Sequence, residues 1–240
     1  MHPLMSSLQK GLDGLGLDVS AEQQAQLLAY MDLIGKWTKV YNLTAIRDAN
    51  EMLTHHLLDS LAVIAPLRRE LAKLPLADAV TVEHGSTGGL KVDSQSAQTN
   101  KQTQFSLLDV GAGAGLPGIV IAITCPEISV TCVDTVAKKA AFIQQVAATL
   151  KLPNLKGLHA RVESLTQPYD VVCSRAFASL IDFTTWSKAA LAEGGVWMAM
   201  KGKHPDQELA LLPESVKVFH VEQLQVPGLD AERCIIWMRG

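Results

Sequence analysis

A glycine-rich segment that follows a short apolar run is the first sign of chemistry in this chain. The run at 107–110 leads directly into Gly111, and glycines recur at Gly113, Gly115 and Gly118. Glycine lets the backbone turn tightly and approach a ligand with no Cβ in the way, and a helix that begins there presents free N–H groups. The spacing fits a nicotinamide dinucleotide, S-adenosylmethionine or a tight turn without a ligand, so the motif alone leaves all three open.

An acidic residue ends the next apolar run, at 130–133. At the end of a second parallel strand, Asp134 is placed to accept both hydroxyl hydrogens of an adenosine ribose bound at the glycine segment. The structural alternative is a cap on the helix expected after it, and one carboxylate can serve both purposes. The neighbouring Lys138 and Lys139 are expected on a solvated helix face.

Arg175 follows a third apolar run, at 171–173. It is therefore expected at the carboxyl edge of the sheet, where open α/β sheets bind ligands. A guanidinium there can hold a carboxylate through two hydrogen bonds or stack on a base. The structural alternative is a salt bridge to Asp170 or Asp182.

These residues need a sheet to position them, and the chain from 105 onward has the pattern of one. Short apolar runs, separated by stretches with helical spacing, occur at 106–110, 130–133, 170–173, 196–200, 216–224 and 234–238. The alternation predicts a doubly wound α/β fold, with a mostly parallel sheet covered on both faces. The last two runs are joined by a short link containing Pro227-Gly228, which predicts an antiparallel end.

The N-terminal part of the chain has helical signals instead. Ser20 and Gln23 form a capping box ahead of an apolar helical pattern, which predicts a helix over 21–39. Asp48 and Glu51 repeat this signature and open another helix, which we expect to stop at Pro66.

Residues 81–104 are dominated by Ser, Thr, Asn, Gln and Gly and hold too few apolar side chains to bury. We expect a flexible insertion there, and a hairpin across Gly88-Gly89 is the less favoured alternative. The predicted organisation is a helical N-terminal extension at 1–75, the insertion at 76–104 and an α/β domain at 105–240.

The overall composition limits the classes of function. With 240 residues and a formal net charge of −3, the chain is unlike a protein that adheres to nucleic acid over its whole surface, so any such contact must be local. The four cysteines lack redox or metal spacing and are expected to be reduced, buried hydrophobes. We expect no metal site, no membrane span and a cytoplasmic location.

Five segments of the chain stand in an order that is typical of one family. They read Tyr-Asn-Leu-Thr-Ala-Ile-Arg at 41–47, His-Leu-Leu-Asp-Ser at 56–60, the glycine segment at 111–118, Arg-Val-Glu at 161–163 and Ser-Arg-Ala-Phe-Ala-Ser-Leu at 174–180. Together they resemble the GidB or RsmG family, bacterial enzymes that methylate N7 of a guanine in the ribosomal RNA of the small subunit. The resemblance covers about 20–80 and 105–240, in order and in register.

The resemblance implies a class I methyltransferase that depends on S-adenosylmethionine. Its fold would be Rossmann-like, with a seven-stranded, mostly parallel sheet and a helical N-terminal extension that helps to bind RNA. Gly111 and Leu116 would contact the methionine and ribose end of the cofactor, with Gly113 and Gly115 in the same loop. Asp134 matches the ribose-binding acid.

The resemblance also assigns residues near the adenine and the reacting atoms. Val162 and Glu163 would contact the adenine, and a helix-start charge is the alternative for Glu163. Arg175 would contact the cofactor or the target base and is the candidate catalytic residue. Because the target base must leave its stack, an aromatic side chain or Arg175 is expected to face the cofactor pocket.

The candidate substrate-binding residues are Asn42, Thr44, Arg47, His56 and Lys201. Asn42 and Thr44 are turn-formers by default, and Lys201 is a surface lysine in the structural alternative. Lys201 is otherwise expected to join Arg47, Lys36 and Lys39 in a local cationic patch for RNA phosphates.

A helix over the 56–60 segment would pair His56 with Ser60, and His55 with Asp59, at one-turn spacing. Such a His-Asp pair invites a general-base role. Guanine N7 has a free lone pair and no proton to lose, however, so methyl transfer needs orientation and charge management rather than a base. His56, Asp59 and Ser60 are therefore expected to be structural or to position the RNA.

The implied partner is 16S ribosomal RNA or the small ribosomal subunit, and we expect a monomer. One alternative is an NAD-dependent oxidoreductase built on the same glycine spacing, although the chain has no recognisable second catalytic domain. The other is a non-enzymatic RNA-binding assembly factor that keeps the fold.

Overall fold

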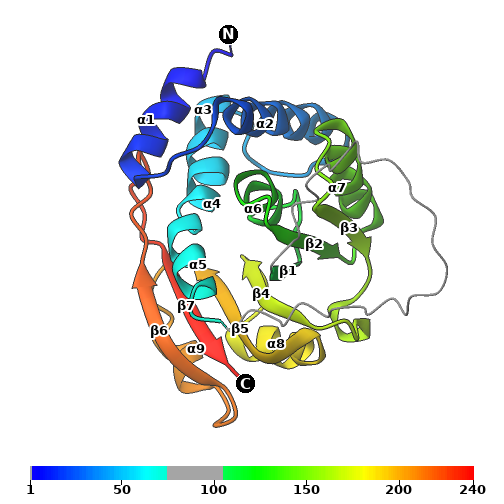
Figure 1. The fold of residues 1–240 in the computed structure, drawn as a ribbon, viewed down its shortest axis with the longest axis vertical. Coiled ribbons are helices and arrows are strands. Elements are labelled where there is room, and N and C mark those ends of the chain that lie inside the picture. The colour runs from blue at the N-terminus through cyan, green and yellow to red at the C-terminus, as the bar shows by residue number, and fades with distance from the viewer. Residues whose placement is uncertain (1, 75–104) are drawn as a thin grey trace, which may run out of the picture.

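The computed structural model describes residues 2–74 and 105–240 and centres on one seven-stranded sheet in the order β3-β2-β1-β4-β5-β7-β6 (Figure 1). The strands are β1 Phe105–Val110, β2 Ile128–Asp134, β3 Leu155–His159, β4 Tyr169–Arg175, β5 Leu191–Lys201, β6 Lys217–Gln223 and β7 Cys234–Arg239. All neighbouring strands are parallel except for β7, which is antiparallel to both β5 and β6. The order reverses between β1 and β4, and open α/β sheets bind ligands at such a point.

This topology confirms the class I, Rossmann-like sheet with an antiparallel end. Six of its strands overlap the apolar runs identified in the sequence. β3 was missed because Leu155–His159 reads Leu-Lys-Gly-Leu-His, with only two large apolar side chains. It lies at one edge of the sheet, where little apolar surface is needed.

The helices surround this sheet. They are α1 Met5–Leu15, α2 Ala21–Tyr41, α3 Ala49–Met52, α4 Asp59–Leu61, α5 Ile64–Leu71, α6 Gly118–Thr124, α7 Ala137–Thr149, α8 Leu180–Ser187 and α9 Asp206–Ala210. The helix predicted over 21–39 is confirmed as α2. Both bonds of its capping box are present, because the Ser20 hydroxyl accepts from the Gln23 N–H at 3.2 Å and the Ser20 N–H donates to the Gln23 side chain at 3.0 Å.

The helix predicted after Asp48 is present, but it ends differently from the expectation. The Asp48 carboxylate caps its first turn, and α3 continues through a π-helical turn at Leu53–Leu58 into α4. The expectation that Pro66 ends this helix is wrong. The break comes at 62–63, and Pro66 lies in the first turn of α5, where its missing N–H costs no intrahelical bond.

Apolar residues from the helices pack on both faces of the sheet. On one face, Leu27 of α2 and Leu57 of the π turn share a core with Ile119 of α6 and the sheet. On the other face, Phe183 of α8 packs with Trp197 of β5. Figure 1 shows α2 and α6 on one side of the sheet and α8 on the other. The N-terminal helices are therefore packed onto the sheet.

All four cysteines are buried and free, as predicted. Within the described residues, no helix combines the length and the apolar character needed to cross a membrane. The predicted insertion at 76–104 lies outside the described residues, and the division into domains stays a prediction.

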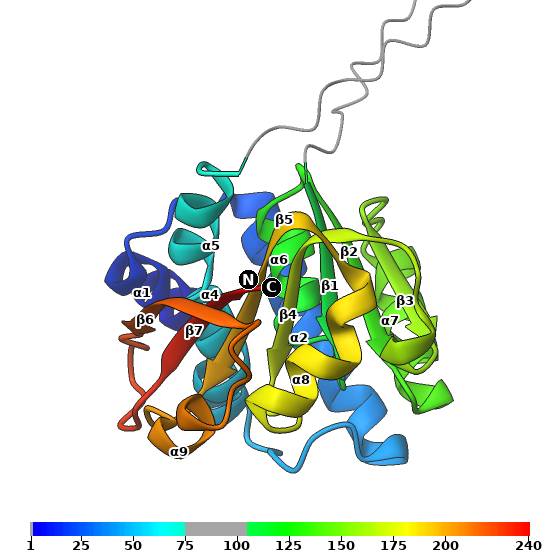
Figure 2. The ribbon, with the colours of Figure 1, turned by 90° about the horizontal axis from the view of Figure 1, so that it is seen from below.

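The end of α2 lies near one edge of the sheet. Figure 2 shows that α2 and the segment after it reach the edge of the sheet opposite to the start of β1.

Gly118 at the start of α6 generates a prediction about packing. A Cβ at this position would overlap the Cys132 sulfur and lie 2.8 Å from an oxygen of Asp109. We expect Gly118→Ala to lower the free energy of unfolding by about 1–3 kcal/mol, measured by urea denaturation. Gly35→Ala in α2 is the control, because its nearest neighbour would be Met52 Cε at 3.9 Å, and it should raise stability by up to about 1 kcal/mol. A Gly118→Ala protein as stable as wild type would contradict the packing described here.

Candidate functional site

A cavity of about 700 Å³ opens at the carboxyl ends of β1, β2 and β4. It lies where the strand order reverses, and its size is typical of a small-molecule site. Its walls are formed by Val110, Gly111, Val133, Asp134, Thr135, Val136, Lys139, Ala160, Arg161, Val162, Glu163, Ala176, Phe177 and Trp186. Four of the predicted cofactor residues, Gly111, Asp134, Val162 and Glu163, are thus brought together from three separate segments.

The glycines of the loop after β1 have different roles. Gly111 has a φ of +66°, and a Cβ there would overlap the ring of Phe177. Gly113 is turned so that its N–H donates to Asp134 at 3.0 Å. Gly115 has a φ of +88°, and a Cβ there would overlap Ile119. Only Gly111 lines the cavity, while Leu116 is buried in the core that the sheet shares with the N-terminal helices.

Asp134 is buried at the end of β2, and both of its carboxylate oxygens are in use. One oxygen accepts from the Gly113 N–H, and the other accepts from the Val136 N–H at 2.8 Å. Asp134 is not itself the N-cap residue of α7, which is Val136, but its carboxylate bonds the N–H of that residue and so supports the start of the helix. Each oxygen of Asp134 keeps a further lone pair for a ligand hydroxyl.

Lys139 was expected on a solvated face, and this expectation is wrong. Its side chain is only 33% exposed, it lines the cavity, and its Nζ lies 3.7 Å from Asp134. Lys138, in contrast, is exposed as expected. The difference follows from the helical turn of α7, which directs adjacent residues to different faces.

Val162 and Glu163 lie in a short 3₁₀ turn after β3. Val162 is buried and offers an apolar surface, whereas Glu163 is exposed and accepts a hydrogen bond from Arg161 at 2.8 Å. This bond lowers the pKa of Glu163. Glu163 therefore lies both in the first turn of a short helix and on the cavity wall.

Two aromatic side chains, Phe177 beside Gly111 and Trp186 next to it, complete the cavity wall. Phe177 contacts Trp186 edge to face, with 5.9 Å between the ring centroids, and Trp186 is 39% exposed. The expectation of an aromatic side chain or Arg175 at this pocket is met by the aromatic pair. Phe177 belongs to the segment that carried the family resemblance, but Trp186 had no sequence signal beyond its residue type.

Arg175 does not line the cavity and turns toward the N-terminal helices. Its Nη1 donates to Asp59 at 2.8 Å and to the backbone oxygen of His55 at 3.1 Å. The other oxygen of Asp59, which is 2% exposed, accepts from Arg233 Nε at 2.7 Å. The salt-bridge alternative for Arg175 was right in kind, but both suggested partners were wrong. Asp59 is far from Arg175 in sequence, and no local pattern indicated the pairing.

The two rejected partners of Arg175 have other contacts. Asp170 accepts from the backbone N–H and hydroxyl of Ser106, on the neighbouring strand β1. Asp182 is bonded to Ser179, which caps α8. Both carboxylates are thus bonded to serines and not to Arg175.

Asp109, which the sequence did not single out, lies beneath the glycine loop. It is fully buried, and one of its oxygens accepts from the Gly118 N–H at 2.8 Å while the other has no partner. Burial raises the pKa of Asp109 to about 7, against the lowering effect of the Gly118 bond and of Arg175. This carboxyl supports the start of α6.

His56 is a buried residue of the π turn and bonds Thr44 Oγ1 through Nε2 at 2.7 Å. Burial and then the nearby Arg175 guanidinium lower the pKa of His56 to about 4. Its ring is therefore neutral at neutral pH. Ser60 is also fully buried. These contacts favour the structural or positioning reading over a general base.

The remaining predicted RNA-binding residues fall into two places. Arg47 donates to the backbone oxygen of Thr38 and to the side chain of Asn42, which ends α2 with a φ of 51°. Arg47, Lys36 and Lys39 line a groove of about 730 Å³ between α2 and α3. Three of the four expected members of the cationic patch are thus together.

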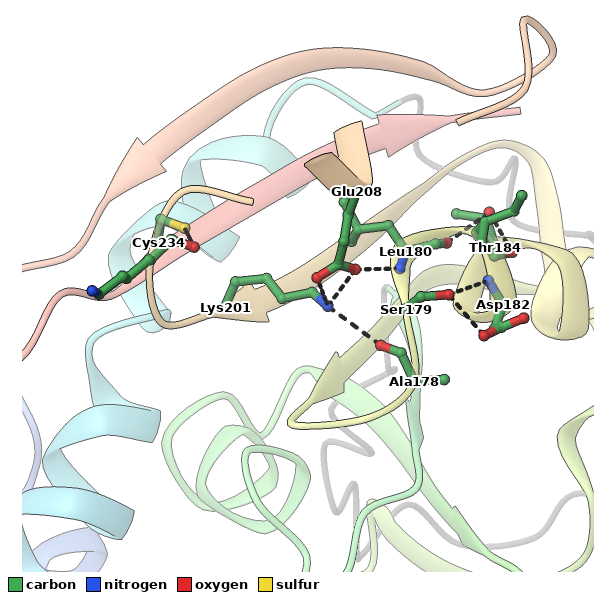
Figure 3. Close-up of polar contacts among 10 residues, drawn as sticks. Ala178, Ser179, Leu180, Asp182, Thr184, Lys201, Glu208 and Cys234 are labelled. Carbon is green, nitrogen blue, oxygen red and sulfur yellow. Dashed lines mark hydrogen bonds and ion pairs between the residues drawn. The ribbon is translucent and has the colours of Figure 1, made fainter. Parts of the chain in front are cut away.

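Lys201 is not a free member of that patch. Its Nζ lies 2.8 Å from one oxygen of Glu208 on α9 and 3.0 Å from the other, and it also donates to the backbone oxygen of Ala178 (Figure 3). Lys201 does not line the groove of Arg47, Lys36 and Lys39, and α9 brings a carboxylate to it. Glu208 also accepts from the Leu180 N–H at 2.7 Å.

The cavity fits an adenosine-containing ligand. It combines a carboxylate with free lone pairs, a buried valine and an aromatic wall, and the missing side chain of Gly111 lets the Phe177 ring pack against the loop. Among the residues that the structure describes, no three His, Cys, Asp or Glu side chains gather as metal ligands would.

Comparison with known proteins gives a consistent result. A family model described as GidB, rRNA small subunit methyltransferase G, matches residues 23–79 and 92–236. Proteins named ribosomal RNA small subunit methyltransferase G are 63% identical in a Polaromonas species, 60% in Polaromonas naphthalenivorans and 62% in Albidiferax ferrireducens. The alignments cover 97%, 98% and 100% of this chain and 92%, 96% and 98% of those proteins, respectively.

Gly111 generates a prediction about the cofactor. We expect Gly111→Ala to weaken S-adenosylmethionine binding at least tenfold by isothermal titration, because the new Cβ competes with Phe177 for the cavity wall. Gly194→Ala is the matched control, since Gly194 has a φ of +74° with no atom within 4 Å of a new Cβ. Both variants should lose about 1–2 kcal/mol of stability through the positive φ, Gly111→Ala should lose more through its overlap with Phe177, and only Gly111→Ala should lose affinity. Equal affinities would show that Gly111 does not form the site.

His56 generates a prediction about pH. Its pKa falls from 6.5 to about 4 on folding, so the unfolded chain takes up a proton over this range that the folded protein does not. The stability contributed by the neutral ring is complete above pH 6.5 and is lost as the pH falls toward 4. We therefore expect the difference in unfolding free energy, wild type minus His56→Gln, to become smaller as the pH is lowered from 6.5 toward 4.

The comparison with His56→Gln is needed because Asp109 acts in the opposite direction. Its pKa is raised on folding, so its contribution falls as the pH rises. Asp109 is present in both proteins and cancels in the difference. A difference that stays constant with pH would mean that His56 titrates normally.

Proposed function

The chain belongs to the rRNA small subunit methyltransferase G family, and from this membership we propose that it transfers a methyl group from S-adenosylmethionine to N7 of a guanine in 16S ribosomal RNA. The observation that carries the proposal is the convergence of Gly111, Asp134 and Val162 on one cavity at the reversal of the strand order. We also propose a cytoplasmic location, because an enzyme of ribosomal RNA acts where the small subunit is assembled.

The cofactor would bind with its adenosine part in this cavity. Asp134 would accept the ribose hydroxyls, Val162 would contact the adenine, and Glu163 would accept from its exocyclic amine. Gly111, on the same wall, would contact the methionine end through its backbone, with Phe177 packed against it. The glycine pattern also fits a nicotinamide cofactor, but the family membership favours S-adenosylmethionine.

When bound, S-adenosylmethionine supplies an electrophilic methyl group on a sulfonium centre. The chain then has to hold guanine N7 in line with that group and to exclude water, and no side chain has to remove a proton. The neutral His56, bonded to Thr44, agrees with this requirement. The aromatic pair Phe177 and Trp186 is suited to contact an extruded base.

Arg175 would act through position rather than by contact with the reacting atoms. Its pairing with Asp59 fixes the end of β4, from which the chain continues into Ala176 and Phe177 on the cavity wall. The candidate catalytic role given to Arg175 is therefore replaced by a positioning role in this proposal. Arg47, Lys36 and Lys39 would bind RNA phosphates beside the site.

The experiment that tests the proposal uses labelled cofactor with naked 16S ribosomal RNA and with assembled small subunits. We expect incorporation into at least one of the two, located at N7 of a guanine by mass spectrometry of the digested RNA. Ribosomal RNA from cells that lack the protein should lose the same modification. Cofactor binding without incorporation into either substrate would favour a non-enzymatic assembly factor.

A further inference from the structure

The end of α2 is brought to the edge of the sheet where the cofactor cavity opens. α2 runs antiparallel to α7, since Gln26 near its start bonds Leu150 at the end of α7, and Trp37 near its end contacts Phe142, with 5.2 Å between ring centroids. Tyr41 is one helical turn beyond Trp37, so it lies toward the start of α7. The start of α7 carries Lys139 of the cavity wall.

The Tyr41 ring packs against Trp37 and remains partly exposed to solvent. Its ring centroid lies 5.1 Å from that of Trp37, at an interplanar angle of 39°, and Trp37 in turn rests against Phe142. Tyr41 is nevertheless 42% exposed, and its neighbour Val40 is 72% exposed. The described residues offer no apolar partner that covers this face, although burying a tyrosine ring is ordinarily favourable.

Cations lie near the end of α2 that carries Tyr41. Lys36, Lys39 and Arg47 line the adjacent groove between α2 and α3, where Arg47 bonds the Thr38 backbone oxygen and the Asn42 side chain, and Lys138 is exposed at the start of α7. Among the described residues, none of the four forms a salt bridge with an acid. An exposed aromatic ring near cations that have no acidic partner is the combination with which proteins bind single-stranded nucleic acid, because bases stack on the ring and phosphates pair with the cations.

We propose that Tyr41 is a stacking platform for an unpaired base of the RNA substrate, next to the guanine that enters the cavity. The inference rests on the proposed function, because it takes the substrate to be RNA. The other exposed aromatic side chains are placed differently. Trp186 belongs to the cofactor cavity, and Phe219 on the edge strand β6 lies under the Arg239 guanidinium.

The test compares three variants with 16S ribosomal RNA as substrate. We expect Tyr41→Ala to raise the KM for RNA roughly fivefold or more, with kcat at saturating RNA and the affinity for S-adenosylmethionine close to wild type. Tyr41→Phe keeps the ring and should restore the KM. Phe219→Ala removes an equally exposed ring from another face and should leave the KM unchanged.

Several outcomes would overturn the proposal. A KM for Tyr41→Ala within twofold of wild type would do so, as would a matching loss of cofactor affinity, which would mark the ring as structural. A Tyr41→Phe variant as weak as Tyr41→Ala would assign the effect to the hydroxyl group instead.

Fluorescence anisotropy with a labelled single-stranded RNA separates this inference from the proposed function. If wild type binds the RNA and Tyr41→Ala binds it at least fivefold more weakly, the platform stands even where no methyl transfer is found. If the two proteins bind equally, the platform is rejected whatever the activity of the wild type.

Discussion

The structure depends on one buried carboxylate held between two guanidinium groups. Asp59 is 2% exposed and bonds Arg175 at the end of β4 and Arg233 just before β7. Loss of either arginine would leave charge buried without full compensation, which typically costs several kcal/mol. Because the three residues belong to the helical layer and to two separate parts of the sheet domain, this network fixes the N-terminal helices against the edge at which the cavity opens.

The same network positions the aromatic wall of the cavity. The segment between β4 and α8 is held at one end by Arg175 and at the other by the Leu180 N–H, which donates to Glu208. Lys201 pairs with Glu208 and also bonds the backbone of Ala178 in this segment. Phe177 is therefore held against Gly111 on the cavity wall.

α2 connects the cofactor cavity with the surface proposed to bind RNA. The buried hydroxyl of Tyr30 donates to the backbone of Ala114 in the glycine loop at 2.7 Å. The same helix carries Trp37 and Tyr41 at its far end. A chain with a net charge of −3 can bind RNA at such a place because the cations there have no acidic partner among the described residues, so the attraction is local.

The sequence by itself determined the features whose physics is local. The capping box at Ser20, the alternation of apolar runs and the glycine loop depend on neighbouring residues, and the placement of Asp134 follows from the rule that parallel strands end at one edge. Only the tertiary structure decided the partners of charged side chains. Arg175 pairs with Asp59 and Lys201 with Glu208, and the first of these pairs joins residues far apart in the chain. A charge takes the partner that packing brings within a few ångströms, and no local pattern records that choice.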